Sequence, residues 1–233
     1  MASKKFIIEN LGTVVVYKRK ANRNLRITLS NKGEIRISIP QWVPYQAGVD
    51  FAKSKKHWIE TKNFEPEPLV NLQQIGRSHR LCFNQSTHES GIHSRISGNQ
   101  IIISYGGNLT TNSPEVQQVA NKASIRALRL QAESLLPQRL DDLAIRYNLT
   151  YKSVGIKQLK RRWGSCDINH NIVLNLFLIQ LSWELIDYVI LHELTHTLYL
   201  NHSPDFWNKL ENLSPDARNL RKRLNSYHPL VGE

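Results

Sequence analysis

The chain has 233 residues, 40% hydrophobic and 21% charged, an ordinary globular composition for one large domain or two small ones. It contains no apolar run long enough for a membrane span and no apparent signal peptide, and two distant cysteines, Cys82 and Cys166, fit a reduced, cytoplasmic setting. Its 31 basic and 19 acidic side chains give a net charge of +12 and a pI near 9.8, so nucleic acid is a possible partner that charge alone does not establish.

Residues 5–40 read as strands. Leucines and isoleucines alternate with polar residues on both sides of Asn31-Lys32-Gly33, which is typical of a turn. This pattern predicts a hairpin that ends at Pro40. Its outward face carries arginines and is expected to be solvated.

After Pro44, residues 45–62 have the spacing of an amphipathic helix, with Trp58 as a packing residue. Short strands follow at about 75–83, 92–97 and 100–105. The polar stretch 106–112 begins Gly-Gly-Asn and resembles a linker. We therefore expect a domain boundary there.

A long helix is predicted from Ser113-Pro114, which supplies an N-cap and a proline at the first helical position, to about Asn148. Pro137 is expected to kink or divide it. Strand character returns over 153–176, and a turn near Asp167 predicts a hairpin. Gly164 in that hairpin would suit the close approach of another backbone.

The most informative stretch is Val189–Leu198, an apolar helix that contains the pattern H-E-x-x-H. On a helix, His192 and His196 lie about 40° apart on one face, one turn apart. Burying two histidines and Glu193 without partners would be costly. A metal ion bound by the two imidazoles, with Glu193 beside a water, would satisfy all three side chains.

An open catalytic zinc site needs a third ligand, and His202 is the first candidate. Six residues on an unbroken helix would turn His202 about 120° away from His196, so the helix must end between them. Asn201 is suited to a left-handed residue at that end, and Ser203-Pro204 reads as the start of the next helix. Asp205 and Glu211 are the alternative third ligands.

These motifs resemble the YgjP-like branch of the SprT-like zinc metallopeptidases. The close match runs from about residue 146 to 212, a looser one covers 14–62, and 64–112 match weakly. The residues that carry it are Arg162–Cys166, Leu174-Asn175, Asp187–Val189, His192–Leu194, His196, Asn201–Ser203 and Phe206-Trp207. Two departures stand out: Ser182-Trp183 replaces a proline before the active-site helix, and Tyr199 replaces the glycine turn of the metzincins, which argues against that subclass.

The sequence patterns and the resemblance together predict an α+β protein. The patterns give a β-rich N-terminal region, residues 1–112 with one helix at about 45–62, and the resemblance implies that it is packed on a mainly helical zincin-type domain, residues 113–233. The hairpin with Gly164 is then expected beside the active-site helix. The resemblance also implies three histidine ligands, Zn²⁺ as cofactor and a peptide or protein substrate.

The expected reaction is peptide-bond hydrolysis by a metal-activated water with Glu193 as general base. Tyr199, Tyr227 and His228 are candidates for polarising the scissile carbonyl, and Cys166 for a regulatory thiolate. The alternatives are a DNA-associated SprT-like protease recruited through its basic surface, hydrolysis of a non-peptide amide, and a metal-binding protein without peptidase activity. An intact Glu193 argues against the last of these.

Overall fold

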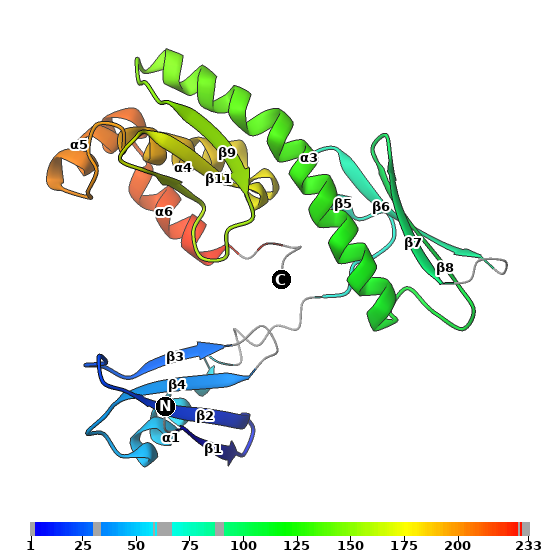
Figure 1. The fold of residues 1–233 in the computed structure, drawn as a ribbon, viewed down its shortest axis with the longest axis vertical. Helices are drawn as coiled ribbons and strands as arrows, with labels where there is room; N and C mark the ends of the chain where they lie inside the picture. Colours follow the sequence, from blue (N-terminus) through cyan, green and yellow to red (C-terminus); the bar gives the residue numbers. More distant parts are fainter. Residues whose placement is uncertain are drawn as a thin grey trace. The chain divides into compact units, whose positions relative to one another are not determined.

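The computed structural model describes residues 3–29, 34–57, 59, 67–86, 91–227 and 229. The chain forms two compact units, Met1–Glu67 and Pro68–Gly232 (Figure 1). Helices and small sheets occur in both units, which confirms the predicted α+β class. Among the described residues, no helix has the length and apolar character needed to cross a membrane.

The first unit is a four-stranded sheet covered by one helix. Its strands are β1 (Ser3–Ile8), β2 (Gly12–Arg19), β3 (Arg26–Leu29) and β4 (Ile35–Pro40), in the order β1-β2-β4-β3. Strands β3 and β4 pair antiparallel, as the predicted hairpin requires, although its turn lies outside the described residues. Alternate residues of β2 and β4 are fully buried, as period-two patterning demands.

Helix α1 (Tyr45–Ser54) packs on this sheet, with Gly48 so close to β2 that an added Cβ would lie 2.6 Å from Val16 Cγ1. The predicted helix over 45–62 is interrupted at Lys55, which forms a turn before residues 56, 57 and 59 become helical again. The N–H of Lys55 bonds to the carbonyls of both Phe51 and Ala52, which tightens the last turn of α1. Trp58 lies outside the described residues.

The second unit begins with a sheet that packs on a long helix. Its strands are β5 (Gln74–Ile75), β6 (His79–Ser86), β7 (Ile92–Ser97) and β8 (Gln100–Gly106), in the order β5-β6-β8-β7. Helix α3 (Pro114–Arg146) lies along this sheet (Figure 1) and shares one apolar core with it. The Gln131 side chain of α3 also donates to Ile75 O and accepts from the N–H groups of Arg77 and Ser78.

Because these strands and α3 share one core, they belong to the same compact unit, and the units divide after Glu67 and not at the predicted boundary between residues 112 and 113. Gly106 ends β8, and residues 107–112 form a connection with turns inside the second unit, because the strands before it and the helix after it bury the same core. Helix α3 is also continuous through Pro137, so of the two predicted outcomes, a kink or a division, the division is wrong. Its end is as predicted: Asn148 adopts a left-handed conformation with φ 51°.

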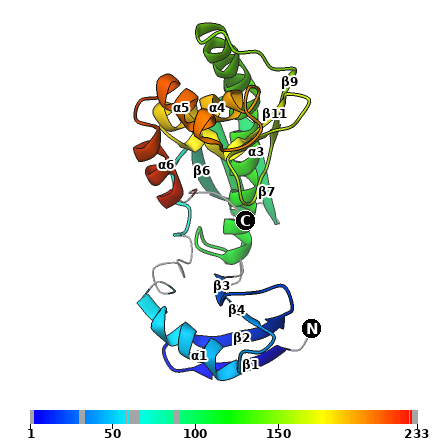
Figure 2. The same cartoon turned by 90° about the vertical axis from the view of Figure 1, so that its left-hand side faces the viewer.

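The rest of the second unit holds a small sheet and three helices. Strands β9 (Ser153–Lys157), β10 (Gly164–Cys166) and β11 (Asn171–Asn175) form a sheet in the order β10-β11-β9, in which β10 and β11 are the predicted hairpin. A 3-10 turn, η1 (Leu176–Gln180), leads to α4 (Trp183–Thr195), α5 (Pro204–Leu213) and α6 (Ala217–Ser226). Helix α4 contacts β10, β11, α5 and α6 (Figure 2), so it is central to this part of the unit.

Candidate metal centre

The H-E-x-x-H pattern lies at the end of α4, whose buried face is almost entirely apolar. The helix ends at Thr195, with His196 as its still-helical C-cap, earlier than the expected end at Asn201. Asn201 is not left-handed; its side-chain oxygen accepts from the N–H of Ser203. The segment 196–203, between the end of α4 and the start of α5, is therefore free to reverse the direction of the chain.

The reversal brings His202 back to the two helical histidines. Ser203 then caps α5, accepting from the N–H of Phe206 at 3.4 Å, with Pro204 in the first turn as predicted. One ligand atom from each of His192, His196 and His202 lies within 4.8 Å of the others, and this is the metal-capable cluster found among the described residues. The alternative third ligands are not part of it, and Glu211 is paired with Arg218 at 2.6 Å.

The distances within the cluster suit a shared ion. The Nε2 atoms of His192 and His202 lie 3.1 Å apart. Around a tetrahedral zinc with Zn–N bonds of about 2.0–2.1 Å, neighbouring nitrogens lie roughly 3.3 Å apart. The two imidazoles are therefore spaced as ligands of one ion would be.

One histidine has the supporting contact that a metal ligand usually has. Nδ1 of His196 lies 3.0 Å from the carbonyl oxygen of Tyr199. Because a carbonyl only accepts, Nδ1 carries the proton and Nε2 keeps its lone pair for a metal. Nδ1 of His192 is buried without a partner in the part of the chain that the structure describes.

Helix α5 forms an aromatic wall beside the histidines. The fully buried Phe206 has its ring centre 4.6 Å from that of His196 and 4.8 Å from that of His202. Trp207 stacks on His202 at 5.7 Å with an interplanar angle of 28°. These contacts hold the His202 ring.

Burial favours the neutral forms of His192 and Glu193. It lowers the pKa of His192 to about 3, and the positive charges of His196, His202 and Arg221 add to that effect. Burial also raises the pKa of Glu193 to about 8, while Arg162 opposes the increase. Neutral imidazoles are the form that binds metal.

Strand β10 approaches the Glu193 side chain closely. A Cβ added to Gly164 would lie 2.7 Å from Oε1, 2.8 Å from Cγ and 2.9 Å from Cδ of Glu193. The sequence predicted the close approach of another backbone at Gly164, whereas the neighbour is this carboxylate. Trp163 packs edge-on against Tyr227 with ring centres 5.9 Å apart.

The other candidate residues have structural surroundings. The Tyr227 hydroxyl donates to the carbonyl of Gln180, and Tyr199 packs on the core. His228 lies outside the described residues. Burial, Glu193 and Asp167 raise the pKa of the Cys166 thiol to about 11, which disfavours a thiolate.

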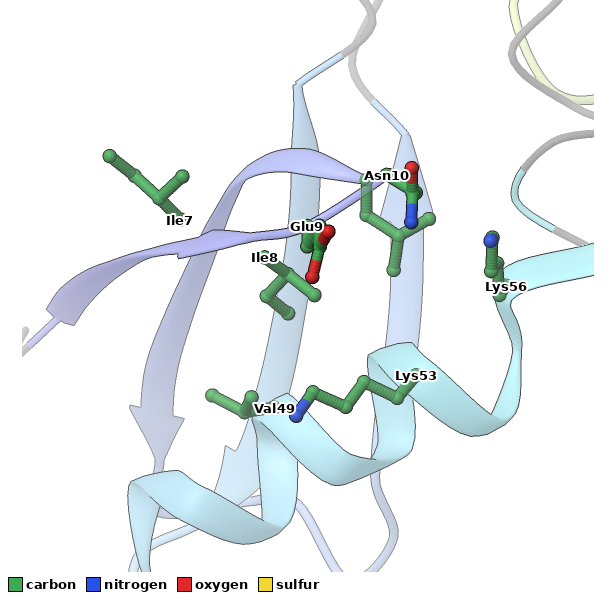
Figure 3. Close-up of a pocket in the computed structure, with 8 residues that line it drawn as sticks. Ile7, Ile8, Glu9, Asn10, Val49, Lys53 and Lys56 are labelled. Carbon is green, nitrogen blue, oxygen red and sulfur yellow. The ribbon is translucent and has the colours of Figure 1, made fainter.

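A hollow of about 310 Å³ in the first unit is lined by apolar side chains, one carboxylate and two lysines, and no histidine is among the described residues that line it (Figure 3). It lies between the turn after β1 and helix α1, and Glu9 is its carboxylate. Figure 3 shows Val49 and Lys53 of α1 on its lower side. The hollow is lined by Ile7, Ile8, Glu9, Asn10, Leu11, Val49, Lys53 and Lys56.

Arg218, Arg221 and Lys222 follow helical spacing on one side of α6. From the sequence, the basic run 218–223 is expected to be a solvated face of a last helix, with no role at the site. Arg221 lies over the ring of Trp207, with its Cζ 5.0 Å from the ring centre. The i, i+3, i+4 spacing was the available signal. The sequence does not show that Trp207 lies between these cations and His202, which becomes apparent only in the fold.

Comparisons with known proteins agree with the site. The family described as YgjP-like, metallopeptidase domain, matches residues 23–227. Two solved metallopeptidase zymogens are similar to part of this chain. Methanocaldococcus jannaschii jannalysin is 24% identical, with a TM-score of 0.35, and Pyrococcus abyssi abylysin is 23% identical, with a TM-score of 0.36. Each match covers 39% of this chain, together with 93% of the jannalysin chain and 91% of the abylysin chain. No curated protein matches the chain. The assignment to a family rests on the first match, because the structural similarities are low.

Proposed function

The chain belongs to the YgjP-like metallopeptidases, and we propose that it hydrolyses peptide bonds with a zinc ion held by His192, His196 and His202. The observation that carries this proposal is the convergence of three imidazoles beside a buried Glu193. Zinc is the ion most often found in such a three-histidine set.

The side chains present fit that ion. His196 is held in the tautomer that leaves Nε2 free, and His192 is neutral in its apolar surroundings. When bound, zinc would supply a Lewis acid that acidifies water and polarises a carbonyl. Phe206 and Trp207 exclude water from one side of the ligand rings, which strengthens electrostatic interactions there.

We assign the proton transfers to Glu193. Its carboxylate would accept a proton from the attacking water and deliver it to the leaving amine. Gly164 leaves room for the carboxylate beside β10. Burial alone disfavours the ionised form of Glu193, whereas a bound divalent cation, together with Arg162, would favour the carboxylate that acts as base. β10 is also an edge strand of its sheet, so an extended peptide could pair with it.

Replacing Glu193 tests this assignment. Glu193→Gln keeps the shape and removes the base, so kcat should fall by about 10²–10⁴ with zinc content unchanged. The matched control is Glu184→Gln, which removes an exposed carboxylate from the first turn of the same helix. Full turnover in Glu193→Gln, with the zinc still bound, would rule out the assigned base.

The third ligand is tested separately by metal analysis. His202→Ala should lower the zinc content after dialysis, whereas Asp205→Ala should leave it unchanged. The reverse result would move the third ligand to Asp205. Cleavage of unfolded protein by the zinc-loaded wild type, and its loss on chelation, would establish the peptidase itself.

A further inference from the structure

A basic groove of about 640 Å³ lies between α5 and α6, beside the metal centre. Its lining includes the indole of Trp207, the carboxylate of Glu211 and three cations of α6, Arg218, Arg221 and Lys222. The opposite side of α6 carries Ala217, Leu220 and Leu224, which are buried. The helix therefore packs through its apolar side and lines the groove with its basic one.

Trp207 connects the groove to the proposed metal ligands. Its ring stacks on His202 at 5.7 Å and also lies under the guanidinium of Arg221. One aromatic ring therefore separates the guanidinium of Arg221 from His202, so the charge of the groove lies next to the three histidines.

The groove has a surplus of positive charge. Glu211 pairs with Arg218 at 2.6 Å, which neutralises one of the three cations. Arg221 and Lys222 have no carboxylate partner among the described residues, so two positive charges are left. Most basic helix faces are simply solvated, but this one lines a concave surface with an aromatic wall next to a reaction centre.

We propose that this groove is a substrate subsite that binds a carboxylate of the peptide near the scissile bond. Arg221 and Lys222 would pair with the carboxylate, and Trp207 would pack on the aliphatic stem of a glutamate. A lysine at the same position would be repelled. This inference rests on the proposed function, and it makes the enzyme selective for acidic peptides.

A matched set of quenched-fluorescence peptides tests this selectivity. All are acetylated and amidated, and Glu, Gln or Lys is placed at each position on either side of the scissile bond in turn. Wild type should cleave the best Glu peptide with kcat/KM about fivefold or more above its Gln partner, and the Lys peptide more slowly still. Added salt should reduce the ratio.

Variants locate the preference in the groove. Lys222→Glu should abolish or reverse the Glu-over-Gln ratio, and Lys222→Gln should reduce it. Arg223→Gln is the matched control, because Arg223 is on the same helix but pairs with Glu184 outside the groove. Equal cleavage of Glu and Gln peptides by wild type, or an unchanged ratio in Lys222→Glu, would overturn the subsite while leaving the peptidase intact.

Binding separates this inference from the proposed function. If wild type cleaves no peptide, fluorescence anisotropy of the Glu and Gln peptides on Glu193→Gln protein decides: selective Glu binding retains the subsite, and equal binding removes it. A Gln peptide with a free C-terminus distinguishes a terminal carboxylate from a side-chain one. If instead duplex DNA binds, Lys222→Glu removes that binding and no peptide binds, the groove is a nucleic-acid surface and the subsite is wrong.

Discussion

Replacing Gly164 by alanine should damage catalysis without removing the metal. The new Cβ would lie 2.8 Å from Cγ of Glu193, whereas two non-bonded carbons prefer at least about 3.5 Å. The shortfall of roughly 0.7 Å must be met by moving the carboxylate or the strand. Gly164 does not have a left-handed φ, so the contact and not backbone strain is what alanine changes.

The size of the effect follows from that displacement. A misplacement of about 1 Å at a catalytic group can cost about 10²-fold in rate, or roughly 2.7 kcal/mol of barrier. Overpacking also lowers the free energy of unfolding, by about 1–3 kcal/mol where the neighbours cannot move. We therefore expect kcat of Gly164→Ala to fall about 100-fold, with its zinc content at the wild-type level.

Steady-state kinetics on one quenched peptide, together with metal analysis and thermal unfolding, would measure these quantities. The control is Gly155→Ala on β9 of the same sheet, where an added Cβ meets no atom within 4 Å. Gly155→Ala should keep wild-type kcat. Wild-type kcat in Gly164→Ala would show that the position of Glu193 is not set by β10, and the reasoning from this contact would be refuted.

Three further predictions concern stability. Asp187→Asn should lower the free energy of unfolding by about 1–2 kcal/mol in urea titrations, because its partly buried carboxylate accepts two bonds, of 2.6 and 2.5 Å, from Arg139. Burial and Asp141 raise the pKa of Tyr151 to about 12 in the folded state, against about 10 in the unfolded state. The protonated hydroxyl therefore contributes fully to the free energy of unfolding below about pH 10, and this contribution is lost as the pH rises through about 12. Tyr151→Phe should flatten the fall in melting temperature over that range. Zinc at about 100 times its Kd should stabilise wild type by about 2.7 kcal/mol, and His202→Ala should lose most of this gain in a calorimetric scan with and without chelator.

Local patterns were sufficient to predict most individual elements. Alternating Ile35, Ile37 and Ile39 are buried in one strand of the first sheet, and Ser203-Pro204 begins a helix where the sequence places one. In each case the signal lies within a few residues of the element and agrees with the packing of the fold. The antiparallel pairing of β10 and β11 was predictable for the same reason.

Pro137 shows how tertiary packing overrides a local rule. A proline removes one helical hydrogen bond, here to the carbonyl of Glu133, and normally kinks or divides a helix. Glu133 lies on the exposed face of α3, where water can replace the lost donor. Leu136 and Leu140 on either side are fully buried and hold both halves of the helix in one core.

The boundary between the units depended on contacts that the sequence does not show. A run such as Gly106-Gly107-Asn108 marks a turn whether the segments around it share a core or not. Here they share one, because β8 and α3 bury their apolar faces against each other. The early end of α4 could not be predicted for a similar reason. The position of His202 requires the helix to end before it, but the sequence alone does not determine the last helical residue.

The proposed metal ligands differed from the groove in predictability for a physical reason. Buried histidines and a glutamate in an apolar helix conflict with their surroundings, and such a conflict is visible in the sequence alone. Arg221 and Lys222 conflict with nothing, since basic residues on the exposed face of an amphipathic helix are ordinary. Their significance comes from Trp207, which the turn after α4 places against His202. A function that depends on concavity and proximity therefore becomes visible only when the fold is known.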